Sequence, residues 1–178
     1  MPEITAESII QEMVCYHFPR YEELPNIPLY SDQVIEALNN YLAPFRQISS
    51  EHTITPAMIN NYVKQHLIPP PVKKRYDREQ FARLYCICLL KHVFSISEIR
   101  GLLEIQTRTY PFPKAYDYFC SELETALKAT FSTRDFSSPS RASKVTPESE
   151  LVRGSALCFA NKVFSVKFLE YCATPQPD

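Results

Sequence analysis

The sequence of 178 residues is 45% apolar and 22% charged, the balance of an ordinary globular protein that can bury a core. With only 2 glycines it holds no glycine-rich phosphate loop or dinucleotide fingerprint, and tight hairpins should be scarce, which disfavours an all-β fold. The net charge of −1 is uneven, since residues 1–51 carry 2 basic and 8 acidic side chains, residues 52–110 carry 9 and 4, and residues 111–178 carry 8 of each. This basic middle segment indicates an anionic partner rather than a particular fold.

The hydrophobic pattern predicts a series of helices, taken here in chain order. A first helix follows the capping residue Thr5, and its apolar stripe reaches Phe18, with Pro19 ending it. A connector over 21–30 contains two prolines. Ser31 then caps a second helix.

A polar loop over 46–53 precedes a third helix. This helix starts at Thr55-Pro56, a capping residue followed by proline at the first helical position. One of its faces is apolar. The other face consists of Ala57, Asn60, Asn61 and Lys64. Three prolines at 69–71 forbid further helix.

A basic stretch over 72–76 follows and is predicted to be extended. Asp77 and Gln80 form a capping box for a fourth helix that runs to about Phe94. Because positions 84–90 are apolar on every side, this helix should be the central and most buried one.

The rest of the chain is also predicted to be helical. A short fifth helix begins after Ser95, and a proline-marked break covers 107–113. A sixth helix spans roughly 114–131, and a Ser/Arg-rich loop covers 132–144. The last helix, over 147–172, would be roughly 37 Å long.

The chemistry of the middle segment is suited to binding DNA, although charge alone is more typical of an ordinary solvated surface. Between residues 64 and 83 there are six basic and two acidic side chains. Asparagine can read adenine edges, whereas lysine and arginine read guanine or neutralise phosphate. The candidate DNA-contacting residues are Thr55, Asn60, Asn61, Lys64, Lys73, Lys74, Arg75, Tyr76 and Arg78. A solvated helix face beside a basic loop is the alternative interpretation.

The order of these elements resembles the winged helix-turn-helix domain of the MerR family. The matching residues are Leu67, Ile68, Pro69 and Pro70 after the third helix, Arg75, Tyr76 and Asp77 at the end of the wing, and Leu84, Ile87, Phe94, Ser95, Glu98 and Ile99 beyond it. The resemblance implies that 55–65 is the recognition helix. His66 stands where that family has glycine, so we expect this helix to be capped without a left-handed glycine.

Two longer segments are more specific. P-x-I-x-L-Y-x-D-Q-V at 25–34 and T-x-x-M-I-N-N-Y-V-K at 55–64 resemble an uncharacterised bacterial family classed as a domain of unknown function. The similarity covers about 24–103. It implies DNA binding and no known chemistry.

We therefore expect an all-α fold with a MerR-like (winged) helix-turn-helix core over 24–106. An N-terminal helix and connector over 1–23 would precede this core, and a C-terminal helical hairpin over 107–178 would follow it. The leading hypothesis is a sequence-specific transcription regulator that binds double-stranded DNA as a homodimer, since two-fold proteins match palindromic sites. The dimer contact would come from the long last helix or from the hairpin of the sixth helix, and the last helix offers two apolar stripes for it. They are Val152, Ala156, Phe159 and Val163, and Leu151, Ser155, Cys158, Val166 and Leu169.

Two other classes of function remain open. The chain would be a protein-interaction adaptor that has lost DNA binding if the acidic N-terminal part masks the basic segment. It would be a small-molecule sensor or enzyme if the aromatic residues over 110–119 line a pocket for an effector. No spacing of Ser, His, Asp or Cys matches a nucleophile motif, so we expect no enzyme and no cofactor.

The cysteines and the hydropathy indicate the compartment. Six cysteines without a CxxC pair predict reduced, mostly buried thiols and no metal site. No apolar stretch is long enough to span a membrane, and the acidic start of the sequence lacks the pattern of a secretory signal. We expect a cytoplasmic protein with no membrane partner.

Overall fold

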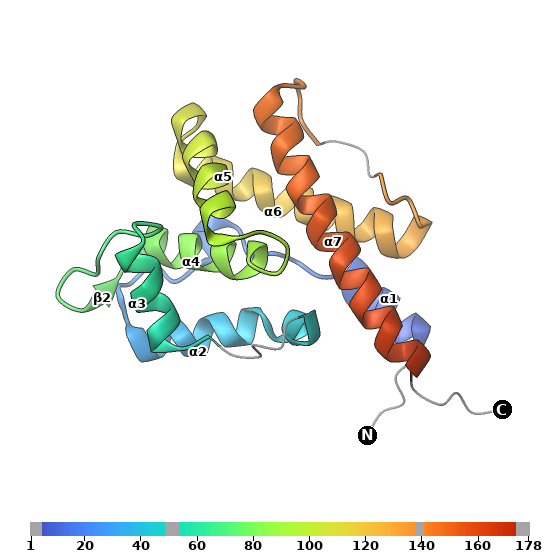
Figure 1. The fold of residues 1–178 in the computed structure, drawn as a ribbon, viewed down its shortest axis with the longest axis horizontal. Helices are drawn as coiled ribbons and strands as arrows, with labels where there is room; N and C mark the ends of the chain where they lie inside the picture. The colour runs from blue at the N-terminus through green and yellow to red at the C-terminus, as the bar shows by residue number, and fades with distance from the viewer. Residues whose placement is uncertain (1–4, 49–53, 138–140, 174–178) are drawn as a thin grey trace. The chain divides into compact units, whose positions relative to one another are not determined.

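The computed structural model describes residues 5–48, 54–137 and 141–173 (Figure 1). These residues are mostly helical, which confirms the all-α prediction, and one two-stranded sheet is added. No helix in the described ranges combines the length and the apolar character needed to cross a membrane.

The chain divides into two compact units. One is formed by Pro19–Asp117, and the other by Met1–Phe18 together with Tyr118–Asp178. The boundary falls inside helix α6 (Phe112–Lys128), so this helix contributes to both units. Each unit is described separately below.

The unit Pro19–Asp117 contains the basic segment. Its further elements are η1 (Tyr21–Glu23), β1 (Leu29–Tyr30), α2 (Ser31–Tyr41), η2 (Ala43–Ile48), α3 (Pro56–Lys64), β2 (Arg75–Tyr76), α4 (Arg78–Leu90) and α5 (Ile96–Thr109). Strands β1 and β2 pair antiparallel, with Leu29 opposite Tyr76 and Tyr30 opposite Arg75. Helix α2 contacts α3 and both strands.

Helix α4 is the most buried helix of this unit, as predicted. Every residue over 84–90 is at most 4% exposed. The capping box is also confirmed, because the Gln80 N–H donates to Asp77 Oδ1 and the Asp77 N–H donates to Gln80 Oε1, both at 2.8 Å. The helix ends at Leu90 rather than near Phe94, since the chain tightens into a turn there. The His92 N–H donates to the Leu89 carbonyl at 3.4 Å and the Val93 N–H to the Leu90 carbonyl at 3.0 Å, each over three residues instead of four.

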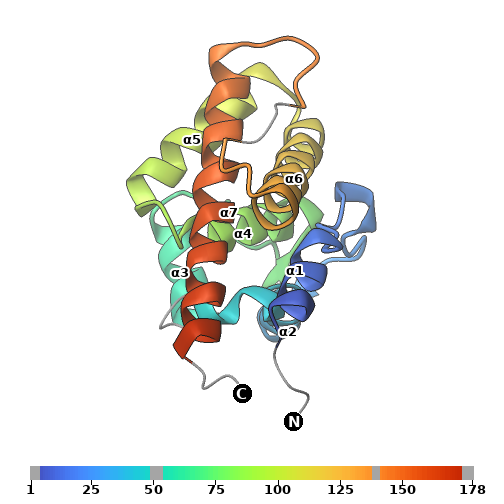
Figure 2. The ribbon, with the colours of Figure 1, turned by 90° about the vertical axis from the view of Figure 1, so that its right-hand side faces the viewer.

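The other unit contains α1 (Ala6–Val14), the end of α6, a π-helical segment η3 (Ala129–Thr133) and α7 (Pro147–Ala173). Helix α1 packs on η3 and α7, and Figure 2 shows the length of α7. Lys167, only 6% exposed, donates from Nζ to Glu12 Oε2 at 2.9 Å. This ion pair ties together two helices that are distant in the sequence.

Several predicted boundaries are corrected. Helix α1 ends at Val14 instead of reaching Phe18. Beyond it the Tyr16 N–H donates to the Met13 carbonyl at 3.4 Å, over three residues instead of four, and the Phe18 N–H donates to Glu124 Oε1 at 2.9 Å. The cap of α2 is Tyr30 rather than Ser31, with the Tyr30 N–H donating to Gln33 Oε1 at 2.9 Å.

The later elements differ in length from the predictions. The fifth helix is not short, since α5 continues through Thr109 into the predicted break, and α6 starts at Phe112. The last helix agrees with the prediction. Residues 49–53 and 138–140 of the two predicted loops lie outside the described residues, while 43–48 form a 3-10 helix.

None of the six cysteines, all within the described ranges, forms a disulfide, but they are not mostly buried. Cys15, Cys158 and Cys172 are exposed, whereas Cys86, Cys88 and Cys120 are buried. The exposed thiols all lie in the unit that contains α1 and α7. Complete burial raises the pKa of the Cys88 thiol to about 12.

The two classes of thiol should react differently with iodoacetamide at neutral pH. We expect Cys15, Cys158 and Cys172 to be alkylated in the native protein, because the reagent reaches exposed thiols and not the buried ones. Mass spectrometry of peptides before and after denaturation measures this difference. Alkylation of native Cys88 as fast as of Cys158 would contradict the burial of α4.

Candidate functional site

Helix α3 presents its predicted polar face to solvent. Asn60, Asn61 and Lys64 are exposed, whereas Ile59 and Tyr62 are 0% and 4% exposed. Thr55, also exposed, caps the helix by accepting the Met58 N–H at 3.3 Å. The helical repeat separates the two faces, so its buried face fixes which polar side chains point outward.

The end of α3 is capped without a left-handed glycine, as the sequence predicted. His66 adopts the left-handed conformation with φ of 57°. The Leu67 N–H donates to the Tyr62 carbonyl and the His66 N–H to the Val63 carbonyl, both at 3.0 Å. These are the two hydrogen bonds of a Schellman motif. The left-handed position is therefore kept, but a histidine occupies it.

A second contact holds the same helix end. Arg100 of α5 donates from Nη2 to the Gln65 carbonyl at 2.6 Å. A cation at the C-terminus of a helix also interacts favourably with the helix dipole. Thr55 thus caps the start of α3, and the contact from α5 holds its end.

The segment after α3 is held by Gln80, and we call this set of contacts the proline clamp. Gln80 is 4% exposed, and its Nε2 donates to the carbonyls of Pro69 and Pro70, both at 3.0 Å. Its Oε1 accepts the Asp77 N–H. One buried amide therefore uses both its donors and its acceptor to join the proline segment to the start of α4.

A two-residue hairpin turn follows the prolines, and we call it the lysine turn (72–75). The Val72 N–H donates to the Arg75 carbonyl at 3.0 Å and the Arg75 N–H to the Val72 carbonyl at 2.9 Å. Its central residues, Lys73 and Lys74, have φ of 49° and 64°. Both values belong to a type I′ turn, which normally uses Asn-Gly. The predicted extended stretch over 72–76 is thus strand only at Arg75–Tyr76.

Left-handed backbone is concentrated at this place. Four non-glycine residues in the described ranges have positive φ, and three of them, His66, Lys73 and Lys74, lie in the connection from α3 to β2. The described glycines have no positive φ, so non-glycine side chains bear the strain. Strained backbone of this kind gathers at functional sites more often than elsewhere.

The two predicted arginines have different partners. Arg75 lies with its guanidinium 4.7 Å from the centre of the Tyr30 ring and donates from Nη2 to the Tyr30 hydroxyl at 2.9 Å. Arg78 forms an ion pair with Glu22 and lies 5.5 Å from the centre of the Tyr21 ring. The positive charge of Arg75 is not neutralised by its partner Tyr30, whereas the carboxylate of Glu22 balances the charge of Arg78.

The lysines are exposed, but Tyr76 is not. Lys73, Lys74 and Arg75 are exposed. Tyr76 is only 4% exposed, and burial raises the pKa of its hydroxyl above the ordinary value. Alternation along β2 explains this difference, since successive side chains of a strand point to opposite faces. Tyr76 is therefore a core residue, and its side chain is not accessible to a binding partner.

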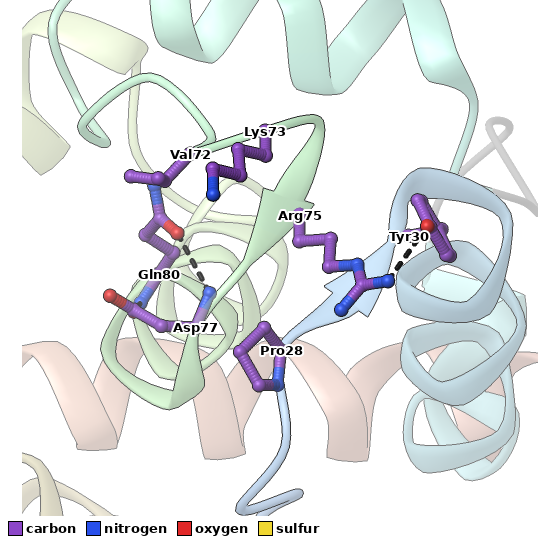
Figure 3. A pocket seen from close by; sticks show the side chains of 7 residues that line it. All are labelled: Pro28, Tyr30, Val72, Lys73, Arg75, Asp77 and Gln80. Carbon is purple, nitrogen blue, oxygen red and sulfur yellow. Dashed lines mark hydrogen bonds between the residues drawn. The ribbon is translucent and has the colours of Figure 1, made fainter.

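The lysine turn borders an open groove of about 590 Å³ (Figure 3). The groove is lined by Pro28, Tyr30, Val72, Lys73, Arg75, Asp77 and Gln80. Sequence reasoning did not place Pro28 and Tyr30 here, because they belong to the predicted connector and only the pairing of β1 with β2 brings them to the turn. Among the described residues, no group of three His, Cys, Asp or Glu side chains could hold a metal ion.

These features define a small helical domain with an exposed cationic turn. The model of the family DUF1836, a domain of unknown function, matches residues 19–119, more than half of the chain, and the chain belongs to this family. This confirms the similarity to such a family, and the match is nearly the same as the compact unit Pro19–Asp117. No curated protein and no solved structure matches the chain.

The proline clamp can be tested by comparing two glutamines at equivalent cap positions. Gln80→Ala leaves the Pro69 and Pro70 carbonyls and the Asp77 N–H without this partner, so we expect the free energy of unfolding to fall by about 1–3 kcal/mol. Gln33→Ala removes only the exposed cap of α2 and should cost about 0.5–1.5 kcal/mol. Urea unfolding measures both values, and equal losses would contradict the clamp.

The strain of the lysine turn predicts a stabilising substitution. Lys73→Asn with Lys74→Gly supplies the residues that a type I′ turn prefers, and we expect it to raise the free energy of unfolding by about 1–2 kcal/mol. Lys73→Ala with Lys74→Ala removes the same charges without relieving the backbone. Thermal or urea unfolding that finds both double variants equally stable would show that the turn is not strained.

Proposed function

We propose that the chain is a sequence-specific DNA-binding regulator, in which α3 reads bases and the lysine turn binds backbone phosphates. The observation that carries the proposal is the lysine turn itself. Two adjacent lysines occupy left-handed positions, at a cost that an Asn-Gly pair would avoid, and both are exposed. Such a turn holds positive charge in a defined place, as binding to a polyanion requires.

The polar face of α3 supports the same proposal. Asn60 and Asn61 are exposed, and an asparagine amide can form two hydrogen bonds with an adenine edge in the major groove. Lys64 lies on the same helix and is exposed. Asn61 Oδ1 accepts a hydrogen bond from Gln65 Nε2 at 3.1 Å, which orients the amide along the helix surface.

The order of elements favours a winged helix-turn-helix of the MerR-like kind. Helices α2 and α3 contact each other, the Schellman motif and proline segment follow, and the lysine turn leads into β2 and α4. In this proposal α3 is the recognition helix and the lysine turn is a minimal wing.

We propose that the protein binds DNA as a homodimer, since a dimer with two-fold symmetry can contact both half-sites of a palindromic sequence. In α7 the stripe of Val152, Ala156, Phe159 and Val163 is buried within the chain. The second stripe is more accessible except at Ser155, which is 4% exposed, because Cys158 is exposed and Leu169 is 71% exposed. This second stripe is therefore the proposed dimer contact.

The salt dependence of binding tests the phosphate contacts. The probe is a mixed-sequence DNA duplex, with the dissociation constant measured by fluorescence anisotropy over a range of salt concentrations. We expect the triple variant Lys73→Ala, Lys74→Ala, Arg75→Ala to bind more weakly, with the log–log salt slope reduced by about 0.9 for each lost phosphate contact. The matched control is Arg108→Ala, Lys128→Ala, Lys162→Ala, which removes the same charge from exposed positions elsewhere.

The outcomes separate the proposed function from its alternative. An equal change of the salt slope in both triple variants would mean that DNA binding depends only on the net charge of the protein and not on the lysine turn. Selection from a random-sequence pool yields duplexes that the protein prefers. Asn61→Ala should change which sequences are preferred more than it lowers the affinity. An equal loss of affinity for every sequence would contradict base reading. No binding by the unaltered protein at low salt would overturn the proposal in favour of a protein-interaction adaptor.

A further inference from the structure

The groove beside the lysine turn has two kinds of surface. One is apolar, because Tyr30 and Val72 are 44% and 72% exposed and Pro28 is also exposed. Ile27, next to Pro28, is 64% exposed and extends this apolar region along the chain. Exposed apolar side chains grouped at a groove indicate a surface that a partner covers.

The other surface is cationic. Lys73 and Arg75 line the same groove, as Figure 3 shows. The guanidinium of Arg75 is held against the Tyr30 ring, so the charge is positioned before any ligand arrives. A planar guanidinium can form two hydrogen bonds with a phosphate. Binding is stronger when such a group needs no further ordering.

The acidic residue of the groove restricts what can enter. Asp77 lies in the lining, and its Oδ1 accepts the Gln80 N–H as the cap of α4. A carboxylate disfavours an anion that reaches it, so an anionic group has to stay near Lys73 and Arg75. An apolar group is then left to contact Tyr30, Val72 and Pro28.

A chain of alternating sugars and phosphates matches these two surfaces, because each anionic phosphate is followed by a less polar sugar. We propose that the groove holds one sugar–phosphate unit of a duplex DNA backbone, with the deoxyribose against Tyr30 and Val72 and the phosphate bound by Lys73 and Arg75. This inference rests on the proposed function, and it adds Tyr30, Val72 and Pro28 to the DNA contacts. A volume of about 590 Å³ is within the usual range of ligand sites.

The experiment uses the full chain, the mixed-sequence duplex and variants that change the apolar surface but no charge. We expect Tyr30→Ala to weaken binding roughly tenfold, as the loss of about 1.4 kcal/mol of contact requires, with an unchanged salt slope. Tyr30→Phe keeps the ring and should stay within about twofold of the unaltered protein. Tyr110→Ala removes an aromatic ring that is 38% exposed outside the groove and should have no effect.

A second, smaller substitution keeps the test valid if Tyr30→Ala fails to fold. Val72→Thr keeps the branched shape at an exposed position and replaces one methyl group by a hydroxyl. We expect weaker binding without a change in thermal unfolding. Full affinity in folded Tyr30→Ala and Val72→Thr proteins would overturn the groove proposal, while DNA binding by the unaltered protein would leave the proposed function intact.

Inorganic phosphate separates a backbone site from a simple anion site. Phosphate has no sugar, so at equal ionic strength it should displace the duplex no better than chloride does. Stronger displacement by phosphate that disappears in the Lys73→Ala, Arg75→Ala variant would show a free-anion site and would overturn the proposal. Absence of DNA binding by the unaltered protein would overturn the proposed function and this inference together.

Discussion

The buried side-chain amide of Gln80 is the contact on which the candidate site depends. Proline has no N–H and cannot join a regular ladder, so the carbonyls of the proline segment need partners from elsewhere. Gln80 supplies both donors for Pro69 and Pro70 while its oxygen caps the start of α4. The most buried helix of the unit thereby sets where the chain leaves α3 and where the lysine turn begins.

The scarcity of glycine shapes the rest of the site. A Schellman motif and a type I′ turn both need left-handed residues, and such positions usually go to glycine or asparagine. Here His66, Lys73 and Lys74 fill them. The backbone conformation is the ordinary one for each motif, so the unusual element is the side chain. At the turn this choice adds two exposed positive charges.

The features of the fold that could be predicted from the sequence depend on residues that are close together in the chain. The caps at Thr55 and at Asp77 with Gln80 depend on contacts within one turn of helix, and both were correct. The all-round apolar stretch over 84–90 required burial on every side. The polar face of α3 follows from the helical repeat alone, so the exposure of Asn60 and Asn61 was also predictable.

Long-range contacts account for what was missed. Tyr30 reaches the site only because β1 pairs with β2, and Glu22 meets Arg78 across a long stretch of chain. The Phe18 N–H, at the end of the predicted first helix, donates instead to Glu124 of α6. The sequence by itself determined that these helices exist, the caps at Thr55 and Asp77 and the basic segment, since these follow from local spacing and charge. Only the tertiary structure decided the left-handed lysines, the burial of Tyr76 and the groove. Hydrogen bonds between Val72 and Arg75 close the turn, and the pairing of β2 with the distant strand β1 places the turn and forms the groove beside it.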